Sequence, residues 1–342
     1  MPKQRWAQKD DVHDQMADMI FGYCVSQTIR ATAEFCVADH LAEGPLTAEE
    51  LADRIGSAPD TTFRLLRAAA TLDLLTVDPQ GRFHPTALLN TLRGDAPRSL
   101  RGMALAATNR AHWLPWTEFV TSVRTGQSHA PAALGMPVFE YLQQNPGLAQ
   151  EFSAGMDSIT SLWAGDVVAV IDTSDVSLAI DVGGANAAML RMLQQANPAL
   201  QGIVFDRPDV AAELAAAVAN SEFADRTDVI GGDFFAAVPG GDLYLLKFIL
   251  HDWDDDSCVR ILQRCRESMA PGGRVAIIEM VLAEQDDPGG VAALMDLNML
   301  AVAGGRERSL AEYDALLAKA GLRRSAVRVS GSPQSVIEAV AA

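Results

Sequence analysis

Short apolar runs alternate with amphipathic helical segments in the second half of the chain, beginning near Val176. The runs read SLAIDVGG, GIVFD, TDVIGGDF, DLYLLKFIL and RVAIIEMVL, and helical patterns at 187–195, 208–219 and 256–269 separate them. Apolar strands joined by helices are typical of a parallel sheet whose two faces are both covered. The pattern therefore predicts an α/β domain with a Rossmann-like, doubly wound sheet, closed by a helix that stops at Gly321 and by two further strands.

The first hundred residues have a different texture, because helical patterns with short breaks dominate them. Thr47 and Glu50 have the spacing of a capping box, and Asp60 is expected to cap the helix that follows. The segment TVDPQGRFH predicts a hairpin that turns at 79–81. Helix, turn, helix and hairpin form a winged-helix order. We therefore expect a winged-helix-like domain at 1–100, followed by a second region at 101–342.

Within that second region, a helical linker at 101–165 is expected to carry the substrate pocket, and 166–342 to form the catalytic domain. Aromatic and methionine side chains of the linker, together with one methionine of the catalytic domain, are candidates for an apolar substrate wall. For any single one of them, the core of a helical bundle is the better interpretation. The candidates are Trp113, Trp116, Phe139, Phe152, Met156, Trp163 and Met299.

The charge and the cysteines restrict the partners and the compartment. The formal net charge is −17, which opposes binding to nucleic acid. The four cysteines lack C-x-x-C spacing, so they are expected to be small buried thiols in a reducing compartment. The start of the chain is polar, and no apolar run approaches the ~20 residues of a membrane span. We therefore expect a cytoplasmic protein without membrane or nucleic-acid partners.

Two strand ends favour a ribose-bearing cofactor. Gly183 follows the first strand, where a glycine lets the backbone approach a ligand, and Asp206 ends the second, where a carboxylate can accept from a ribose diol. The turn reads GGANAA and lacks the later glycines of G-x-G-x-x-G, which place a pyrophosphate on a helix N-terminus. A nucleoside without phosphates tolerates that loss better. The turn therefore favours S-adenosylmethionine and disfavours a nicotinamide-dependent oxidoreductase.

The third strand ends at Asp233 and Phe234. A carboxylate at this edge could accept from an adenine amino group, and the ring could flank the base. The alternative interpretation, a helix cap followed by a core phenylalanine, stays open with equal weight.

An imidazole and four acids end the fourth apolar run, in LLKFILHDWDDDS. His251 is expected at the same carboxyl edge as the candidates above, where α/β sheets place their active sites, so we interpret it as functional. The acids 254–256 are expected to cap and begin the next helix. Glu279 ends the next strand and should lie beside the imidazole, where a carboxylate fixes the tautomer and stabilises the cation. Glu307 is a second candidate for that role.

A metal is not expected at this edge. Apart from the acids 254–256, which are assigned to a helix cap, no cluster of Asp, Glu and His has ligand spacing along the chain.

The motifs DVGG, GDFF, YLLKFILHDWDDD, PGG and GGRERSLAEYDALLAKAGL resemble those of the S-adenosylmethionine-dependent O-methyltransferases that methylate hydroxyls of aromatic natural products. The resemblance is to the plant caffeate type and the bacterial antibiotic-tailoring branch of secondary metabolism, and it covers nearly the whole length. It implies a homodimer built on the winged-helix region, with His251 as general base flanked by Glu279 and Glu307. It also implies that the cofactor is held by Gly183, Asp206, Asp233, Phe234 and Lys247.

The chain departs from this family in the glycine turn, where Ala185 and Ala187 stand in place of usual glycines. Their methyl groups could narrow the methionine end of the cofactor pocket or weaken affinity.

The expected reaction is methyl transfer from the sulfonium to a phenolic oxygen. A phenol near pKa ~10 and an imidazole near ~6.5 differ by ~3.5 units, roughly 5 kcal/mol, which a neighbouring carboxylate would reduce. Two alternatives stay open: a family member with hydroxylation or decarboxylation chemistry, and a winged-helix, ligand-responsive regulator. We associate the first with loss of the histidine, which this chain keeps. The sequence does not identify the acceptor, nor does it fully separate O- from N-methylation.

Overall fold

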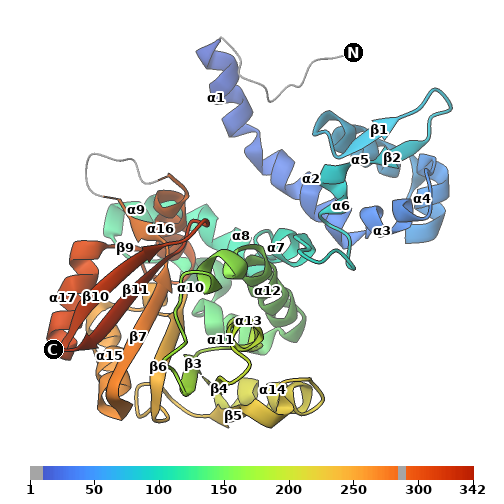
Figure 1. Ribbon diagram of the computed structural model, residues 1–342. Helices are drawn as coiled ribbons and strands as arrows, with labels where there is room; N and C mark the ends of the chain where they lie inside the picture. Colours follow the sequence, from blue (N-terminus) through green and yellow to red (C-terminus); the bar gives the residue numbers. More distant parts are fainter. Residues whose placement is uncertain (1–10, 284–289) are drawn as a thin grey trace. The chain divides into compact units, whose positions relative to one another are not determined.

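A computed structural model describes residues 11–283 and 290–342 (Figure 1). The chain forms two compact units. One comprises the described residues up to Trp113 together with Leu142–Leu162, and the other comprises Leu114–Tyr141 with Trp163–Ala342. The helical segment 101–165 thus contributes to both units.

The first unit is mainly helical and carries one hairpin. Its antiparallel strands are β1 (Leu75–Val77) and β2 (Phe83–Pro85). Two further helices, α11 (Val138–Gln144) and α12 (Pro146–Val168), cross the division between the units. The other helices are α1 (Val12–Ile20), α2 (Gly22–Glu34), α3 (Val37–Ala42), α4 (Ala48–Ile55), α5 (Pro59–Thr71), α6 (Ala87–Asn90), α7 (Arg101–Ala106) and α8 (Arg110–Trp113).

The local signals of the winged-helix segment are largely confirmed. Thr47 and Glu50 form the capping box of α4, and the hairpin turns where proline and glycine predicted it. The prediction that Asp60 caps α5 is wrong. Ala58 is the N-cap and Pro59 begins the helix, because proline is pre-organised for the first helical position. Asp60 therefore lies in the first turn, where its charge still favours the helix dipole.

The second unit is built on a seven-stranded sheet. In the order β10-β11-β7-β6-β3-β4-β5, the five strands from β7 to β5 are parallel, whereas β11 is antiparallel to both of its neighbours. The predicted doubly wound sheet is thus confirmed, with an antiparallel edge formed by the two closing strands. The strands are β3 (Leu178–Val182), β4 (Gln201–Asp206), β5 (Thr227–Gly231), β6 (Gly241–Lys247), β7 (Met269–Glu279), β10 (Leu322–Val329) and β11 (Ser335–Ala341).

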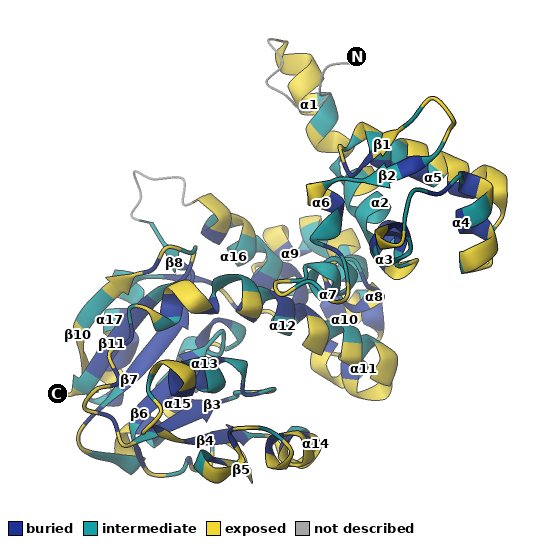
Figure 2. Cartoon of the chain, turned by 45° about the vertical axis from the view of Figure 1, so that its right-hand side comes forward, coloured by how far each residue is buried: buried dark blue, intermediate teal, exposed yellow. Residues whose placement is uncertain are grey.

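Helices cover both faces of this sheet (Figure 1). On one face lie α13 (Ala188–Ala196), α14 (Pro208–Ala219) and the end of α12; on the other lie α15 (Asp255–Ser268) and α17 (Leu310–Ala320). Successive residues of each central strand enter opposite cores, so these strands are buried on both sides and are dark blue in Figure 2. The remaining elements are η1 (Leu114–Glu118), α9 (Phe119–Thr125), α10 (Ala130–Leu134), η2 (Ala224–Arg226), η3 (Leu250–Asp252), β8 (Val281–Leu282), α16 (Gly290–Val302) and β9 (Arg308–Ser309).

Among residues 11–283 and 290–342, no helix is long and apolar enough to cross a membrane.

Candidate active site

The site lies where the strand order reverses. From β3 the chain proceeds outward to β4 on one side, and later to β6 and β7 on the other. In open α/β sheets, the crevice at the carboxyl ends of the two strands that flank such a reversal is the usual ligand site. Loops that follow β3 and β6 therefore supply its first candidates.

Gly183 begins the turn after β3 and has φ of 70°, a left-handed conformation that glycine adopts without penalty. A Cβ at this position would lie 2.4 Å from Cδ1 of Ile249, which follows β6. The absence of a side chain thus lets the two loops of the crevice pack directly against each other.

Ala185 and Ala187 also have positive φ, 44° and 64°. A left-handed conformation costs roughly 1–2 kcal/mol for a residue with a Cβ, so both alanines strain the turn where glycine would not. Asp206 holds this strained turn in place. Its Oδ2 accepts from the Ala185 N–H at 2.9 Å, while its Oδ1 accepts from the Arg207 N–H at 2.7 Å. The carboxylate proposed for the ribose is therefore also a support of the glycine turn.

The pair after β5 matches the alternative interpretation only in part, because Asp233 closes a turn with no helix after it and Phe234 is partly buried against the core. Asp233 is exposed, and its Oδ1 accepts from the Phe235 N–H at 2.9 Å, which closes a turn. The Phe234 ring packs edge-on against Trp253, with centroids 5.9 Å apart. The adenine contacts expected of Asp233 and Phe234 stay a prediction.

Lys247 is the last residue of β6, and its Nζ lies 4.6 Å from the centroid of the Phe248 ring. Near it, at the end of β3, lies Asp181, which sequence reasoning missed. Burial raises the pKa of the Asp181 carboxyl to about 7, although the charge of Lys247 opposes the rise. Its Oδ2 is buried and has no hydrogen-bond partner among the described residues. A buried, unpaired carboxyl oxygen beneath the glycine turn is a feature of ligand sites.

His251 does not end a strand, contrary to the expectation that the run to Leu250 is one. The strand β6 ends at Lys247, Phe248 has φ of 53°, and the short 3₁₀ turn η3 then carries the histidine. A left-handed non-glycine residue costs of order 1–3 kcal/mol and marks backbone that its surroundings hold in place. The Phe248 ring stacks on the imidazole, with centroids 5.0 Å apart and 9° between the planes. The strained residue thus redirects the chain and also orients the imidazole ring.

Three carboxylates surround the buried imidazole. Nδ1 lies 2.8 Å from Glu307 Oε1 and 3.5 Å from Glu279 Oε2, while Nε2 lies 3.7 Å from Asp252 Oδ1. A carboxylate only accepts hydrogen bonds, so Nδ1 carries a proton and Nε2 is the nitrogen left for proton exchange. Burial disfavours the charged imidazole, but the charge of Glu279 and the hydrogen bond to Glu307 outweigh it and raise the pKa of His251 to about 10.

Glu279 has a second task, because its Oε1 accepts from three successive backbone N–H groups. They belong to Ile249, Leu250 and His251, at 3.2, 3.1 and 3.4 Å. Burial raises the pKa of Glu279 to about 7, although the charge of His251 opposes the rise. The two carboxylates that the sequence left undivided thus have separate positions: Glu279 holds the turn, and Glu307 holds the ring.

The donor atoms of His251, Glu279 and Glu307 all lie within 4.8 Å of one another, a spacing that could hold a metal ion. The expectation that no metal binds at this edge stays a prediction. Spacing along the chain does not reveal the cluster, because the three residues come from separate segments that only the fold brings together. In the structure, Oε1 of each glutamate already accepts hydrogen bonds from the histidine or its turn.

Acids 254–256 behave largely as expected. Asp254 caps α15 by accepting from the Ser257 N–H at 2.7 Å, and Asp255 lies in the first turn. Asp255 also pairs with Arg308 at 2.9 Å, and Arg308 is fully buried. Sequence reasoning missed buried Arg308 and partly buried Asp252, because nothing in the pattern of either segment marks a charged residue as withdrawn from solvent.

The candidate substrate wall is divided between the units. Trp113, Phe152 and Met156 belong to the first unit, where His112 stacks on Phe152 with centroids 5.7 Å apart. Trp116, Phe139, Trp163 and Met299 belong to the second, in which Met299 is buried and both Trp116 and Phe139 are exposed. A substrate role for these residues stays a prediction.

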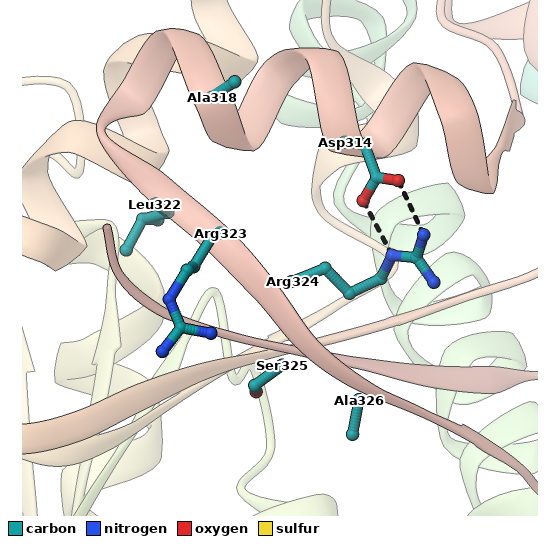
Figure 3. Close-up of a pocket in the computed structure, with 7 residues that line it drawn as sticks. All are labelled: Asp314, Ala318, Leu322, Arg323, Arg324, Ser325 and Ala326. Carbon is teal, nitrogen blue, oxygen red and sulfur yellow. Dashed lines mark hydrogen bonds and ion pairs between the residues drawn. The ribbon is translucent and has the colours of Figure 1, made fainter.

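A surface cavity of about 440 Å³ lies between α17 and β10 (Figure 3). Its Arg324 is paired to Asp314 through two hydrogen bonds of 2.7 and 2.6 Å. In the register of the sheet, Arg324 lies opposite Ala339 of β11, and Ala339 lies opposite Val275 in the middle of β7. The cavity therefore does not lie at the carboxyl end of β7. This cavity is therefore separate from the candidate site at the carboxyl edge.

Comparisons with known proteins identify the family of this chain. The O-methyltransferase domain model matches residues 116–323, and the O-methyltransferase dimerisation domain model matches residues 17–93. The mitomycin biosynthesis 6-O-methyltransferase of Streptomyces lavendulae is 34% identical over 310 residues, which cover 90% of this chain and 88% of the relative. The phenazine O-methyltransferase PhzM of Lysobacter antibioticus is 33% identical over 325 residues, which cover 95% of each chain.

A solved structure of human N-acetylserotonin methyltransferase in complex with SAM superposes with a TM-score of 0.90 at 29% identity, covering 97% of this chain and 98% of that one. The resemblance noted from the motifs is thereby confirmed. The O-methyltransferase domain model matches more than half of the chain, and relatives that are about a third identical span nearly all of it. This protein therefore belongs to the O-methyltransferase family.

Proposed function

We propose that this protein transfers a methyl group from S-adenosylmethionine to a hydroxyl of an aromatic small molecule, with His251 as general base. The observation that carries the proposal is a buried imidazole at the carboxyl edge of the sheet, whose Nδ1 is held by Glu307 at 2.8 Å. Relatives named for phenazine and mitomycin methylation support the acceptor class. Neither a nicotinamide oxidoreductase nor a ligand-responsive regulator has comparable support.

The residues at the crevice fit the cofactor. Each oxygen of Asp206 accepts one backbone N–H and keeps capacity for a ribose hydroxyl. Gly183 is partly exposed at the turn after β3, Lys247 ends β6, and the pair Asp233–Phe234 follows β5. When bound, S-adenosylmethionine supplies a methyl group already activated by the positive sulfur. The protein has to align the acceptor oxygen with that methyl group, exclude water and take the hydroxyl proton at Nε2 of His251.

The raised pKa of His251 changes the energetics of that proton transfer. At about 10 it matches a phenol of pKa ~10, so moving the proton between them is nearly neutral in free energy and not roughly 5 kcal/mol uphill. The imidazole of the resting enzyme is then mostly protonated at neutral pH. At neutral pH the imidazole is a cation and the phenol is neutral. The imidazolium must therefore lose a proton to solvent before Nε2 can accept the phenol's proton.

This protonation state predicts a rate that rises with pH. With a phenol of pKa ~10 we expect kcat/KM to increase by up to about tenfold per pH unit between pH 7 and 9, because deprotonated His251 becomes more abundant. Initial rates across this range test it, with cofactor affinity measured at each pH as the control. A profile that is flat over these two units would contradict the protonated resting state.

The reaction itself is tested by a screen of phenols, hydroxyquinolines, phenazines and polyketide aromatics, read by mass spectrometry for a methyl gain. An aniline series in the same screen separates N- from O-methylation. Products that have gained oxygen or lost carbon dioxide would favour the non-methylating alternative. Failure of every acceptor to gain a methyl group would overturn the proposal.

Asp206→Ala is expected to weaken binding of S-adenosylmethionine by about 1.5–3 kcal/mol, the usual worth of a charged hydrogen bond. Isothermal titration of wild type and variant measures the change. Because Asp206 also holds the Ala185 N–H, unfolding without cofactor is the control that separates turn damage from lost ribose contacts. Unchanged affinity in a folded variant would show that Asp206 is not at the ribose. Nicotinamide dinucleotides are expected to stabilise neither the wild type nor the Asp206→Ala variant.

A homodimer built on residues 1 to about 100 is the expected assembly. None of the residues of α1 is buried, although Met16, Met19 and Ile20 are apolar and 58, 75 and 63% exposed, and the helix is largely yellow in Figure 2. Apolar surface of this kind marks an interface. The dimerisation domain model covers residues 17–93, which include Met19 and Ile20.

Light scattering at micromolar concentration should give twice the chain mass, and Met16→Ser with Met19→Ser should lower the mass towards the monomer. Val329→Ser, a change at an apolar residue that is 77% exposed in β10, is the matched control and should leave the mass unchanged. A monomeric wild type would refute the assembly.

A further inference from the structure

The turn that carries His251 is held from two sides by charged side chains. Its N–H groups donate to Glu279, as described above. On the other side, Arg308 donates from Nη1 to the Leu250 carbonyl at 2.9 Å and from Nη2 to the Trp253 carbonyl at 2.7 Å. The Arg306 N–H donates to the His251 carbonyl at 2.8 Å. Backbone groups that a regular helix would pair internally are thus paired by a carboxylate on one side and a guanidinium on the other.

Arg308 is fully buried, and its guanidinium is nearly saturated with partners. Besides the two carbonyls, Nε and Nη2 donate to Asp255 Oδ1 at 3.1 and 2.9 Å. Four of its five N–H donors are therefore used, and one carboxylate balances the charge. The planar fork joins the turn before α15 to the first turn of that helix. A lysine ammonium cannot span these three acceptors in one plane.

The segment that bears Arg308 lies in direct contact with the histidine turn. A Cβ on Gly305 would lie 1.8 Å from the His251 carbonyl oxygen and 2.8 Å from the Cα of Asp252. Only glycine permits this approach. The same short segment delivers Glu307 to Nδ1 and, at the next residue, Arg308 to the turn carbonyls. The distance from Nδ1 of His251 to Glu307 therefore depends on the hydrogen bonds that hold the turn against this segment.

Backbone strain at the start of the turn makes its hydrogen bonds to the segment of Arg308 necessary. Phe248 enters the turn with a left-handed backbone, which is unfavourable for a residue with a side chain. We propose that Arg308 is a positioning residue for methyl transfer, whose guanidinium fixes the carbonyls of the His251 turn and so holds the imidazole in register with Glu307. The kinetic consequence rests on the proposed function, whereas the geometric one does not.

Arg308→Lys keeps the charge and removes the planar fork, so it is the informative variant. We expect kcat for an unactivated phenol to fall roughly 10- to 100-fold, because a displacement of about 1 Å in a catalytic group costs up to that much. KM for S-adenosylmethionine should stay within about twofold. Arg306→Lys is the matched control, since its exposed guanidinium contacts only Asp255 and Glu312 in the described chain, and its backbone N–H is retained.

A readout without acceptor or cofactor separates this inference from the proposed function. The imidazole of His251 is titrated by NMR in the full-length wild type and in both variants. In Arg308→Lys the midpoint should move from about 10 towards the ordinary histidine value, because a loosened turn weakens the hydrogen bond to Glu307. Arg306→Lys should titrate like wild type. If no acceptor is methylated but the midpoint moves, the proposed function fails and the positioning role stands.

Two results would overturn the positioning role. One is an Arg308→Lys protein that unfolds at lower temperature while its His251 midpoint and its kcat match wild type, which would make Arg308 a structural residue only. The other is an equal loss of kcat in Arg306→Lys. If Arg308→Lys fails to fold, Asp255→Asn replaces it: the weakened counter-ion should give the same shift of the midpoint with a smaller loss of kcat, and an unchanged midpoint would again overturn the role.

Discussion

Replacing His251 with alanine or glutamine is expected to lower methyl transfer to an unactivated phenol roughly 10²–10⁴-fold, the usual worth of a positioned general base. Binding of S-adenosylmethionine should stay near wild type, because the residues expected to hold it lie at the ends of β4 and β6 and just after β3 and β5, whereas His251 lies in the turn beyond β6. Single-turnover rates and calorimetric affinities measure the two quantities separately.

The dependence on the acceptor distinguishes a base from a positioning role. An acceptor that is already ionised at neutral pH needs no base, so the ratio of wild-type to variant rates should shrink as the acceptor pKa falls. A ratio that stays large and flat across the series would mean that His251 positions the acceptor and does not take its proton. Activity that is untouched for every acceptor would overturn the central role assigned to this residue.

Glu307→Gln is expected to lower the rate roughly 10²–10³-fold at neutral pH, by analogy with the loss when the carboxylate behind a catalytic imidazole becomes an amide. Glu307 can only accept from Nδ1, so it enforces the tautomer with a free Nε2. A glutamine can present an N–H instead, which would leave the proton on the wrong nitrogen. Removing the negative charge should also lower the pKa of His251, so the rise of activity with pH should move to lower pH.

Glu279→Gln is the comparison for this prediction. Its amide oxygen can still accept from the N–H groups of the turn, while the charge that does most to raise the pKa of His251 is lost. We therefore expect the pH profile to shift as in Glu307→Gln, with a smaller loss of maximal rate because Nδ1 keeps its acceptor. Equal maximal rates for the two variants would show that control of the tautomer by Glu307 contributes little.

Local patterns predict most of the regular structure. The helix expected at 208–219 has those bounds, and the capping box of Thr47 and Glu50 forms as expected, because both signals depend on neighbours within one or two turns. The predicted end of β6 is wrong. The apolar residues up to Leu250 continue past Lys247 into a buried 3₁₀ turn, and an apolar run does not distinguish a buried strand from a buried turn.

What the sequence determined by itself is the sheet, the edge at which the candidate site lies and the chemical types gathered there. Parallel strands bring their carboxyl ends to one edge, so the strand ends near Gly183, Asp206 and Glu279 are enough to locate the crevice. The tertiary structure alone decided which atoms pair: Glu307 with the ring, Glu279 with the turn, and buried Arg308 with the carbonyls opposite. The physical reason is that hydrogen bonds and desolvation depend on distances of a few tenths of an ångström between segments far apart in the chain, which hydrophobic periodicity does not encode.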